Sequence, residues 1–279
     1  MKYIEIKAPA KINIGLDILS KREDGFHNLS TLFYPIQDLF DTLHVERTEK
    51  FSFSCAETTI PTDDTNIVVK AKNLLEKISG KKLTAKIELI KRIPSQAGLG
   101  GGSSDAAAVL ISLNEMFQLG FNHNQMIDLS VELGADVPFF IKAKPAIGSS
   151  KGEVLELVEL DIEQPILLIN PKINIATKEA FSSIIPNGIS FDYENVLKNG
   201  HLDFSMAKKF LKNDFENFIF YKYPEIGKIK EVCLNNGAIF SLMSGSGSTV
   251  YGIFNNENDA LRVMKLLPQE YFMFLSNPR

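Results

Sequence analysis

The sequence has little of what metal-binding, redox, nucleic-acid-binding and membrane proteins depend on. Cysteine occurs twice in 279 residues, at Cys55 and Cys233, and the four histidines lack the i, i+4 spacing that binds zinc. Thirty basic against 34 acidic residues give a net charge of −4, without the basic excess of a nucleic-acid binder. No apolar run is long enough to cross a bilayer, and the N-terminal residues alternate in polarity like a strand rather than a signal or transit peptide. We therefore expect a mildly acidic, soluble cytoplasmic protein with reduced thiols and no nucleic-acid or membrane partner.

Short alternating stretches and longer amphipathic ones divide the chain. Strands are expected at 3–8, 11–19, 29–36, 41–47, 51–55, 83–93 and 165–169, with a turn at Asp24-Gly25. Helices are expected at about 66–79, 104–117 and 124–133. The C-terminal part alternates strands and helices and ends in strand, strand, helix, strand. This order predicts an α+β fold with helices packed on antiparallel sheets, and a Lys/Pro/Gly/Ser cluster at 143–152 predicts two domains, 1–150 and 151–279.

The stretch "AGLGGGSSDAAAVL" (97–110) joins a predicted strand to a predicted helix. Glycines let the backbone point successive N–H groups into one concavity, and a helix N-terminus adds free donors, so the loop favours a phosphate ligand. No lysine follows the glycines as in a Walker loop, the G-x-G-x-x-G spacing of dinucleotide-binding loops is absent, and so are the H-R-D and D-F-G motifs of protein kinases. A negative charge at Asp105 would repel phosphate. We expect it to cap the helix, the alternative being a cation between Asp105 and the phosphates.

Three further stretches carry polar groups in apolar surroundings. Asp136 in "LGADVPFF" lies between a helix end and an expected apolar strand, and such a carboxylate is either bonded to nearby backbone or functional. In "APAKINIGL", Lys11 and Asn13 lie on one face of a strand, as a pocket wall requires. "SLMSGSGSTVYGIF" is a second glycine–serine loop, either a hairpin or, beside the first loop, a phosphate lining.

Together and in this order, "APAKINIGL", "IPSQAGLGGGSSDAA" and "MSGSGSTVYGIF" resemble the GHMP kinase superfamily. The resemblance implies an N-terminal domain like ribosomal protein S5 domain 2, which would bind ATP, and a C-terminal ferredoxin-like domain for the substrate. "REDGFHNLSTLF", "TNIVVKA" and "LGADVPFF" make it closest to the kinases that phosphorylate the 2-hydroxyl of 4-diphosphocytidyl-2-C-methyl-D-erythritol in the non-mevalonate isoprenoid pathway. It is dense up to about residue 160 and thins between 183 and 235.

The resemblance assigns roles to residues at matching positions. Asp136 matches the catalytic aspartate, which would accept the hydroxyl proton, and Lys11 matches the catalytic lysine, which would stabilise the developing alkoxide and keep Asp136 ionised. ATP would be bound by Asn66, near the adenine, and by Pro94, Ser95, Gln96, Ala97, Gly98, Leu99, Gly100, Gly101, Gly102, Ser103 and Ser104. The C-terminal glycine motif is Gly245, Ser246 and Gly247. ATP chemistry implies Mg²⁺, whose ligands the spacing does not assign.

The cytidine end of the substrate would meet Phe26, His27 and Phe181, with the two phenylalanines stacking on cytosine and His27 hydrogen-bonding to its edge. The family often has Tyr where this chain has Phe26, so stacking is retained but a hydroxyl is lost. Asn13 and Thr177 match polar substrate contacts. We expect a monomer or weak homodimer. The alternatives are another GHMP kinase, acting on homoserine or mevalonate, which "DGFH" argues against, and a nucleotide-binding protein without catalysis, which would have lost Asp136 or Lys11.

Overall fold

The computed structural model describes residues 2–186 and 188–277. The chain forms two compact units, and neither is continuous in sequence. Unit 1 comprises Met1–Ala10, Leu39–Ser95 and Gly100–Lys144, and unit 2 comprises Lys11–Asp38, Gln96–Leu99 and Pro145–Arg279. This division follows contacts in space rather than the chain, and the domains expected from the sequence at 1–150 and 151–279 stay a prediction.

Two long strands carry residues of both units, β1 (Tyr3–Lys21) and β2 (His27–Arg47), which pair with each other. The sequence predicts each of them as two shorter strands. Pro9 separates the two strands predicted within β1, and residues 37–40 separate the two predicted within β2, but pairing between β1 and β2 maintains the extended backbone. The predicted turn is present, since Gly25 has a φ of 84° and the Arg22 N–H bonds to the Phe26 carbonyl at 2.8 Å.

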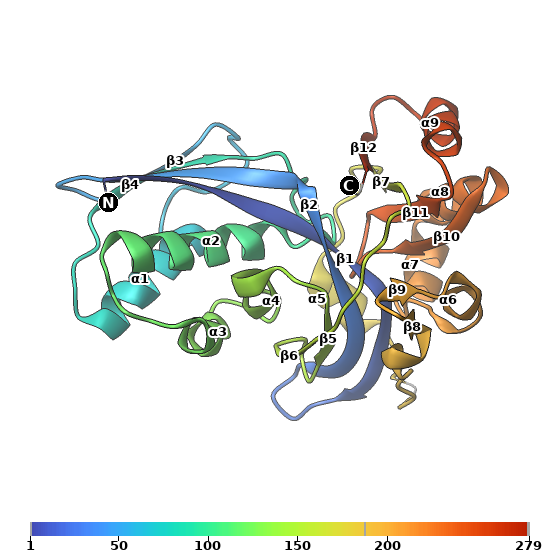
Figure 1. Cartoon of the computed structure of the whole chain (residues 1–279), viewed down its shortest axis with the longest axis horizontal. Helices are drawn as coiled ribbons and strands as arrows, with labels where there is room; N and C mark the ends of the chain where they lie inside the picture. Colours follow the sequence, from blue (N-terminus) through green and yellow to red (C-terminus); the bar gives the residue numbers. More distant parts are fainter. Residues whose placement is uncertain (1, 187, 278–279) are drawn as a thin grey trace. The chain divides into compact units, whose positions relative to one another are not determined.

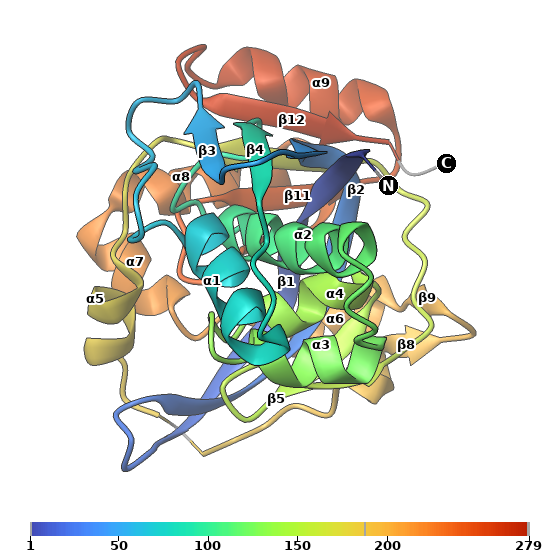
Figure 2. The ribbon, with the colours of Figure 1, turned by 90° about the vertical axis from the view of Figure 1, so that its left-hand side faces the viewer.

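Unit 1 combines four helices with the N-terminal end of β1 and the C-terminal end of β2 (Figure 1). Its other elements are β3 (Ser52–Cys55), α1 (Ile67–Ser79), β4 (Ala85–Ile90), α2 (Gly101–Met116), α3 (His123–Ser130) and α4 (Val137–Lys142). β3 and β4 run parallel, as the intervening crossover helix α1 permits, and β2 pairs antiparallel with β4. α1 and α2 lie side by side (Figure 2), and all four helices lie on one side of the strands.

Local signals explain the ends of the unit 1 helices. Asn66 caps α1 by accepting from the Val68 N–H, and Gly80, with a φ of 66°, ends the helix. In β4, alternate side chains from Ala85 to Leu89 are buried, which confirms a strand with one wet face. Residues 137–142 form a helix, so the prediction of an apolar strand there was wrong. Pro138 in the first turn and apolar burial favour a helix, and six residues are too few for periodicity to distinguish the two.

Unit 2 contains the four-stranded antiparallel sheet β10–β11–β7–β12. The order strand, helices, strand, strand, helix, strand with this neighbour arrangement is the ferredoxin-like arrangement expected for the C-terminal part. The other part of unit 2 adds β5 and β6 to the first half of β2. The strands of unit 2, besides β1 and β2, are β5 (Ala146–Ser149), β6 (Val154–Leu157), β7 (Ile166–Asn170), β8 (Leu197–Lys198), β9 (His201–Leu202), β10 (Ala238–Met243), β11 (Val250–Phe254) and β12 (Phe272–Ser276).

The helices of unit 2 pack on its four-stranded sheet and bury a hydrophobic core. α8 packs on β10 and β11, and α9 packs on β11 (Figure 1). The core they share includes Leu167, Ile229 and Phe254. The helices of this unit are α5 (Thr177–Ser182), the 3₁₀ helix η1 (Tyr193–Val196), α6 (Phe204–Phe210), α7 (Glu216–Lys222), α8 (Pro224–Asn235) and α9 (Glu257–Leu266). Among the helices described in either unit, none has the length and apolar character needed to cross a membrane.

Candidate active site

The glycine loop leaves β4 at residue 91 and enters α2 at Gly101. Gly98 has a φ of 77°, and a Cβ there would lie 2.1 Å from the Ser244 carbonyl oxygen. Gly100 has a φ of 72° and is the N-cap residue of α2. These two positions require glycine because of backbone conformation and, at Gly98, because another loop approaches closely. No side chain caps α2, so the first-turn N–H groups keep their capacity to bind an anion.

Asp105 does not cap α2, so the expected capping role was wrong. Its carboxylate accepts a hydrogen bond from the Lys91 ammonium at 2.8 Å, and Lys91 also pairs with Asp41 of β2. The Lys91 side chain is 6% exposed. The cation beside Asp105 is therefore a lysine of unit 1.

The Lys91 cluster is stabilised from several sides. Asp41 also accepts from the backbone N–H groups of Arg92 and Ile93, at 2.6 and 2.9 Å, so its charge is well compensated. Burial raises the pKa of Asp105 to about 8, although the Lys91 charge opposes that rise. A Cβ on Gly101 would lie 3.2 Å from the Lys91 ammonium, so this glycine admits the cluster beneath the loop.

Ser104 has the one buried side-chain hydroxyl that lacks a hydrogen-bond partner among the described residues. It lies in the first turn of α2 and its residue is 1% exposed. Within the described part of the chain, no three His, Cys, Asp or Glu side chains gather into a metal site. Mg²⁺ that is bound to ATP needs only one or two protein oxygens besides the phosphate oxygens. The Ser104 hydroxyl, in the first turn of α2, fits such an ion.

Lys11 and Asn13 are buried on β1 in unit 2, each 3% exposed. The Lys11 ammonium donates to Asn13 Oδ1 at 2.7 Å and lies 5.5 Å from the centre of the Phe33 ring. Asn13 Nδ2 donates to Thr31 Oγ1 at 2.9 Å. The expected polar face of this strand is thus a hydrogen-bonded chain rather than a set of solvated side chains.

The second glycine–serine loop contacts both β1 and the first half of the glycine loop, all within unit 2. Ser244 Oγ accepts from the Asn13 N–H at 3.2 Å and donates to the Gly98 carbonyl at 2.9 Å. The Thr249 N–H donates to the Ala97 carbonyl at 3.3 Å, and Ser246 Oγ lies 3.3 Å from Thr177 Oγ1. The two loops that the sequence singles out are therefore neighbours, which was the condition for a shared phosphate-lining role.

Asp136 is the N-cap residue of α4 by backbone conformation, is half-buried, and its side chain makes no cap hydrogen bond. Asp136 belongs to unit 1 and Lys11 to unit 2. Their joint action stays a prediction.

The sequence predicts that Phe26 and Phe181 both stack on cytosine, but in the structure the ring that stacks on Phe181 belongs to His27. His27 and Phe181 stack, with ring centroids 5.2 Å apart and planes 25° apart, and Phe181 also meets Phe215 edge-on. Phe26 is 56% exposed and its ring lies 4.9 Å from the Lys151 ammonium. Burial lowers the pKa of His27, so the imidazole is neutral near pH 7.

Asn66 has a structural role that the sequence resemblance does not reveal. Its Oδ1 caps α1, and its Nδ2 donates to the Pro61 carbonyl at 2.7 Å. Sequence reasoning missed Lys91 and Asp41, and it included Thr31 in "REDGFHNLSTLF" without giving it a role. They lie in ordinary strand patterns or next to them, and their partners are distant along the chain, so no local signal marks them.

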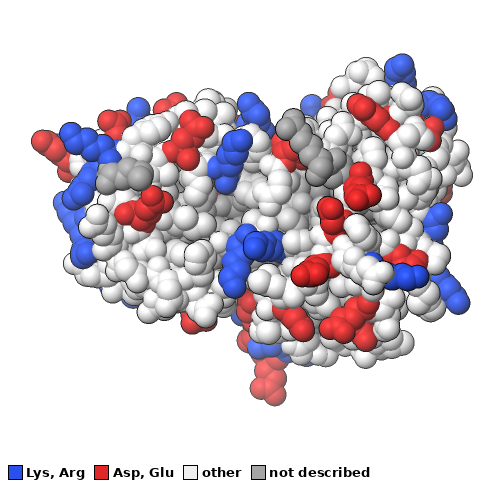
Figure 3. All heavy atoms as spheres, in the orientation of Figure 1, with Lys and Arg blue, Asp and Glu red and all other residues white. Residues whose placement is uncertain are grey.

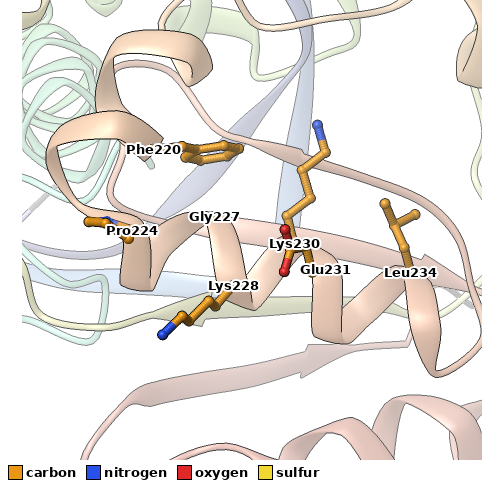
Figure 4. Close-up of a pocket in the computed structure, with 7 residues that line it drawn as sticks. All are labelled: Phe220, Pro224, Gly227, Lys228, Lys230, Glu231 and Leu234. Atoms are coloured by element: carbon orange, nitrogen blue, oxygen red, sulfur yellow. The ribbon is translucent and has the colours of Figure 1, made fainter.

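One surface groove lies away from the predicted site residues. A groove of about 410 Å³ lies between α7 and α8 (Figure 4), and its lining contains none of the predicted site residues. In Figure 4 the Phe220 ring and the Lys228 side chain, both of which line the groove, extend away from each other. On the face shown in Figure 3, the described acidic and basic residues are interspersed, without the continuous basic stripe of a nucleic-acid interface.

Comparison with known proteins agrees with this arrangement. The family model of the GHMP kinases N terminal domain matches residues 66–144, and that of the GHMP kinases C terminal domain matches residues 196–271. The chain therefore belongs to the GHMP kinases, and it is a small-molecule kinase that uses ATP as phosphoryl donor.

Full-length relatives place it more narrowly. The chain is 40% identical over 285 residues to 4-diphosphocytidyl-2-C-methyl-D-erythritol kinase of Pelodictyon phaeoclathratiforme, covering 100% of this chain and 98% of the relative. It is 41% identical over 254 residues to the kinase of that name from Bacteroides thetaiotaomicron, covering 89% and 91%. Within the superfamily it belongs to the family that these 4-diphosphocytidyl-2-C-methyl-D-erythritol kinases form.

Solved structures confirm the predicted two-domain GHMP kinase fold. A crystal structure of 4-(cytidine 5'-diphospho)-2C-methyl-D-erythritol kinase matches with a TM-score of 0.81 and 31% identity, over 98% of each chain. Homoserine kinase from Cytophaga hutchinsonii matches with a TM-score of 0.77 at 18% identity, over 100% of this chain and 95% of that one. The second match shows a common fold only.

Proposed function

We propose that this kinase transfers the γ-phosphoryl group of ATP to the 2-hydroxyl of 4-diphosphocytidyl-2-C-methyl-D-erythritol, a step of the non-mevalonate isoprenoid pathway. The observation that carries the proposal is the full-length match, at 40% identity, to a kinase named for that substrate. The stacked His27 and Phe181 rings support it, because a cytosine base needs an aromatic surface and a neutral hydrogen-bonding edge. Homoserine and mevalonate have no base to stack.

The glycine loop would bind the triphosphate. The uncapped N-terminus of α2 offers backbone N–H donors and the positive end of the helix dipole. Ser103 and Ser104 would supply hydroxyl oxygens to phosphate or to the accompanying Mg²⁺. That ion, when bound, neutralises charge on the phosphate oxygens during transfer.

Asp136 would accept the proton of the attacking hydroxyl. A tertiary alcohol has a high pKa, so a positioned acceptor lowers the barrier as the oxygen bonds to phosphorus. Lys11 would stabilise the developing negative charge on that oxygen. Most of the rate enhancement would still come from positioning, as in other phosphoryl transfers.

The substrate proposal is tested by following ADP release with 4-diphosphocytidyl-2-C-methyl-D-erythritol, homoserine and mevalonate in parallel. We expect turnover with the cytidylyl alcohol alone. Phosphorylation of homoserine, without turnover of the cytidylyl substrate, would contradict the proposal. It would then favour another specificity on the same fold.

The base proposal is tested by Asp136→Asn. The amide cannot accept the proton, so kcat should fall by at least about a hundredfold, while ADP binding stays within about twofold of the parent in calorimetry. Asp128→Asn is the matched control, because Asp128 is an exposed carboxylate of α3 in the same unit. Near-parental turnover of Asp136→Asn would exclude Asp136 as an essential base.

A further inference from the structure

The strand that carries Lys11 is linked to a buried threonine to which the sequence motifs assign no role. Thr31 lies on β2, opposite β1, and is 0% exposed. Its hydroxyl donates to the Gly15 carbonyl at 2.6 Å, and its oxygen accepts from Asn13 Nδ2 at 2.9 Å. Asn13 Oδ1 then faces the Lys11 ammonium at 2.7 Å.

The direction of these hydrogen bonds determines the orientation of the Asn13 amide. A hydroxyl has one hydrogen to donate, and the Gly15 carbonyl takes it. Towards Asn13, Thr31 therefore acts only as an acceptor, so the NH₂ group of Asn13 must face Thr31 and the carbonyl oxygen must face Lys11. The reversed amide would place two NH₂ hydrogens against an ammonium group, which has only donors.

The backbone of Asn13 is fixed independently of its side chain. Its N–H donates to Ser244 Oγ at 3.2 Å, and its carbonyl accepts from the Tyr251 hydroxyl at 3.1 Å. Only the side-chain amide remains to be oriented, and Thr31 is the neighbour that orients it. Removing the Thr31 oxygen therefore frees the rotation of the Asn13 amide next to Lys11, while the backbone hydrogen bonds of Asn13 remain.

We propose that Thr31 is a positioning residue of this kinase: through the Asn13 amide, it fixes the Lys11 ammonium in the orientation used for phosphoryl transfer. The proposal rests on the role assigned to Lys11 under the proposed function. Lys11 provides the positive charge, and Asn13 Oδ1 accepts a hydrogen bond from it. Thr31 holds the Asn13 amide in the orientation that turns this oxygen towards Lys11.

The first test compares Thr31→Val with Thr31→Ser. Valine keeps the shape and removes the hydroxyl, whereas serine keeps the hydroxyl and removes the methyl group. We expect Thr31→Val to lower kcat about tenfold while KM for ATP stays within about twofold, since the lost interaction acts in the transition state. Thr31→Ser should keep kcat within about twofold of the parent. Equal loss of kcat in both variants would refute the proposal, because packing and not the hydroxyl would then matter.

A second test separates positioning from a general loss of stability. Ser130→Ala is the matched control, because Ser130 is buried, donates to the Ile127 carbonyl at 2.7 Å, and lies outside the predicted site. Both Thr31→Val and Ser130→Ala should lower the melting temperature, but only Thr31→Val should lower kcat. A parallel loss of kcat in Ser130→Ala would contradict a positioning role. If Thr31→Val does not fold, Thr31→Ser remains decisive, because a tenfold loss of its kcat would contradict the proposal.

A double-mutant cycle with Lys11→Met tests the route of action. If Thr31 acts through Lys11, the double variant Thr31→Val/Lys11→Met should have the kcat of Lys11→Met alone. Multiplied losses would refute that route. The assay uses whichever alcohol the parent phosphorylates. Parental kcat in Lys11→Met would therefore contradict the proposed function, whereas a lowered kcat in Lys11→Met with none in Thr31→Val would contradict only the positioning role.

Discussion

Replacing Lys91 by methionine should destabilise the protein, and by more at pH 8.5 than at pH 7.0. The Lys91 ammonium is buried between two carboxylates whose side chains are 0% and 3% exposed. Methionine keeps the aliphatic volume but leaves Asp41 and Asp105 without their shared cation. Removing one partner of a buried ion pair costs about 3–5 kcal/mol, because the remaining charge is uncompensated.

The two carboxylates should respond differently to this loss. Asp41 keeps the hydrogen bonds from the Arg92 and Ile93 N–H groups when Lys91 is replaced. Asp105 Oδ1 has no hydrogen-bond partner among the described residues, so Asp105 is the group that takes up a proton. Its pKa is already raised by burial, and loss of the Lys91 charge raises it further. Below about pH 8 the parent and the variant both take up a proton at Asp105 on folding, so the cost of the substitution should be nearly constant from pH 5.5 to 7.0 and larger at pH 8.5, where the parent carboxyl is ionised.

Urea unfolding at pH 5.5, 7.0 and 8.5 measures this effect. Lys86→Met is the matched control, because Lys86 pairs with Glu88 at 3.9 Å on β4 with both side chains about half exposed, and such a pair contributes less than about 1 kcal/mol. The double variant Lys91→Met/Asp105→Asn should recover part of the loss, since the unpaired carboxylate is gone. A loss below about 1 kcal/mol at pH 8.5, or one that does not change with pH, would refute this account of the cluster.

Two other predictions concern the same loop and helix. Gly98→Ala should lower the unfolding free energy by more than about 2 kcal/mol, because its Cβ would lie 2.1 Å from the Ser244 carbonyl in a backbone with a φ of 77°. Gly102→Ala, whose Cβ would meet only Ile67 at 3.8 Å, should be neutral or stabilising in the same urea titration, and a similar loss in both would contradict the steric argument. Asp105→Asn should flatten the pH dependence of stability between about pH 4 and 8. The folded pKa of Asp105 is raised, so its contribution is most favourable at low pH and is lost as pH rises towards about 8, with a slope of up to about 1.4 kcal/mol per pH unit. An unchanged slope in thermal unfolding across that range would exclude Asp105 as its source.

Periodic segments of the chain were predictable because local pattern and tertiary context agree in them. The expected helix at 66–79 is α1, with its cap at Asn66 and its stop at Gly80, and both signals are local. The long strands β1 and β2 were predicted in pieces, since the pairing that bridges their weak positions is not local. Residues 137–142 were mistaken for a strand because a short apolar run has the same appearance in both structures.

The site residues that were predictable are likewise those marked by a local sequence signal. Lys11, Asn13 and the two glycine loops were identified because each belongs to a contiguous motif. The structure confirms that the second loop lies next to Gly98, which spacing alone could not decide. The roles of Lys91 and Thr31 were missed because they come from partners on other strands or helices. Asp105 was noticed but assigned a cap, since the sequence shows its place in the first turn of a helix and not the lysine that faces it.

The glycines of the loop are required for different reasons, and only some of these reasons involve a ligand. Gly98 is required by the approach of the Ser244 carbonyl, and Gly101 by Ile93 and the Lys91 ammonium, so packing within the protein explains both. Gly102 is exposed, has no positive φ, and would tolerate a Cβ in the described structure. Glycine costs helix stability at such a position, and no protein contact offsets that cost. Gly102 is therefore the glycine whose presence is best explained by the close approach of a ligand, and a Gly102→Ala variant that folds normally but binds ADP at least about tenfold more weakly would support that explanation. Unchanged ADP affinity would leave the glycines of this loop explained by packing and backbone conformation alone.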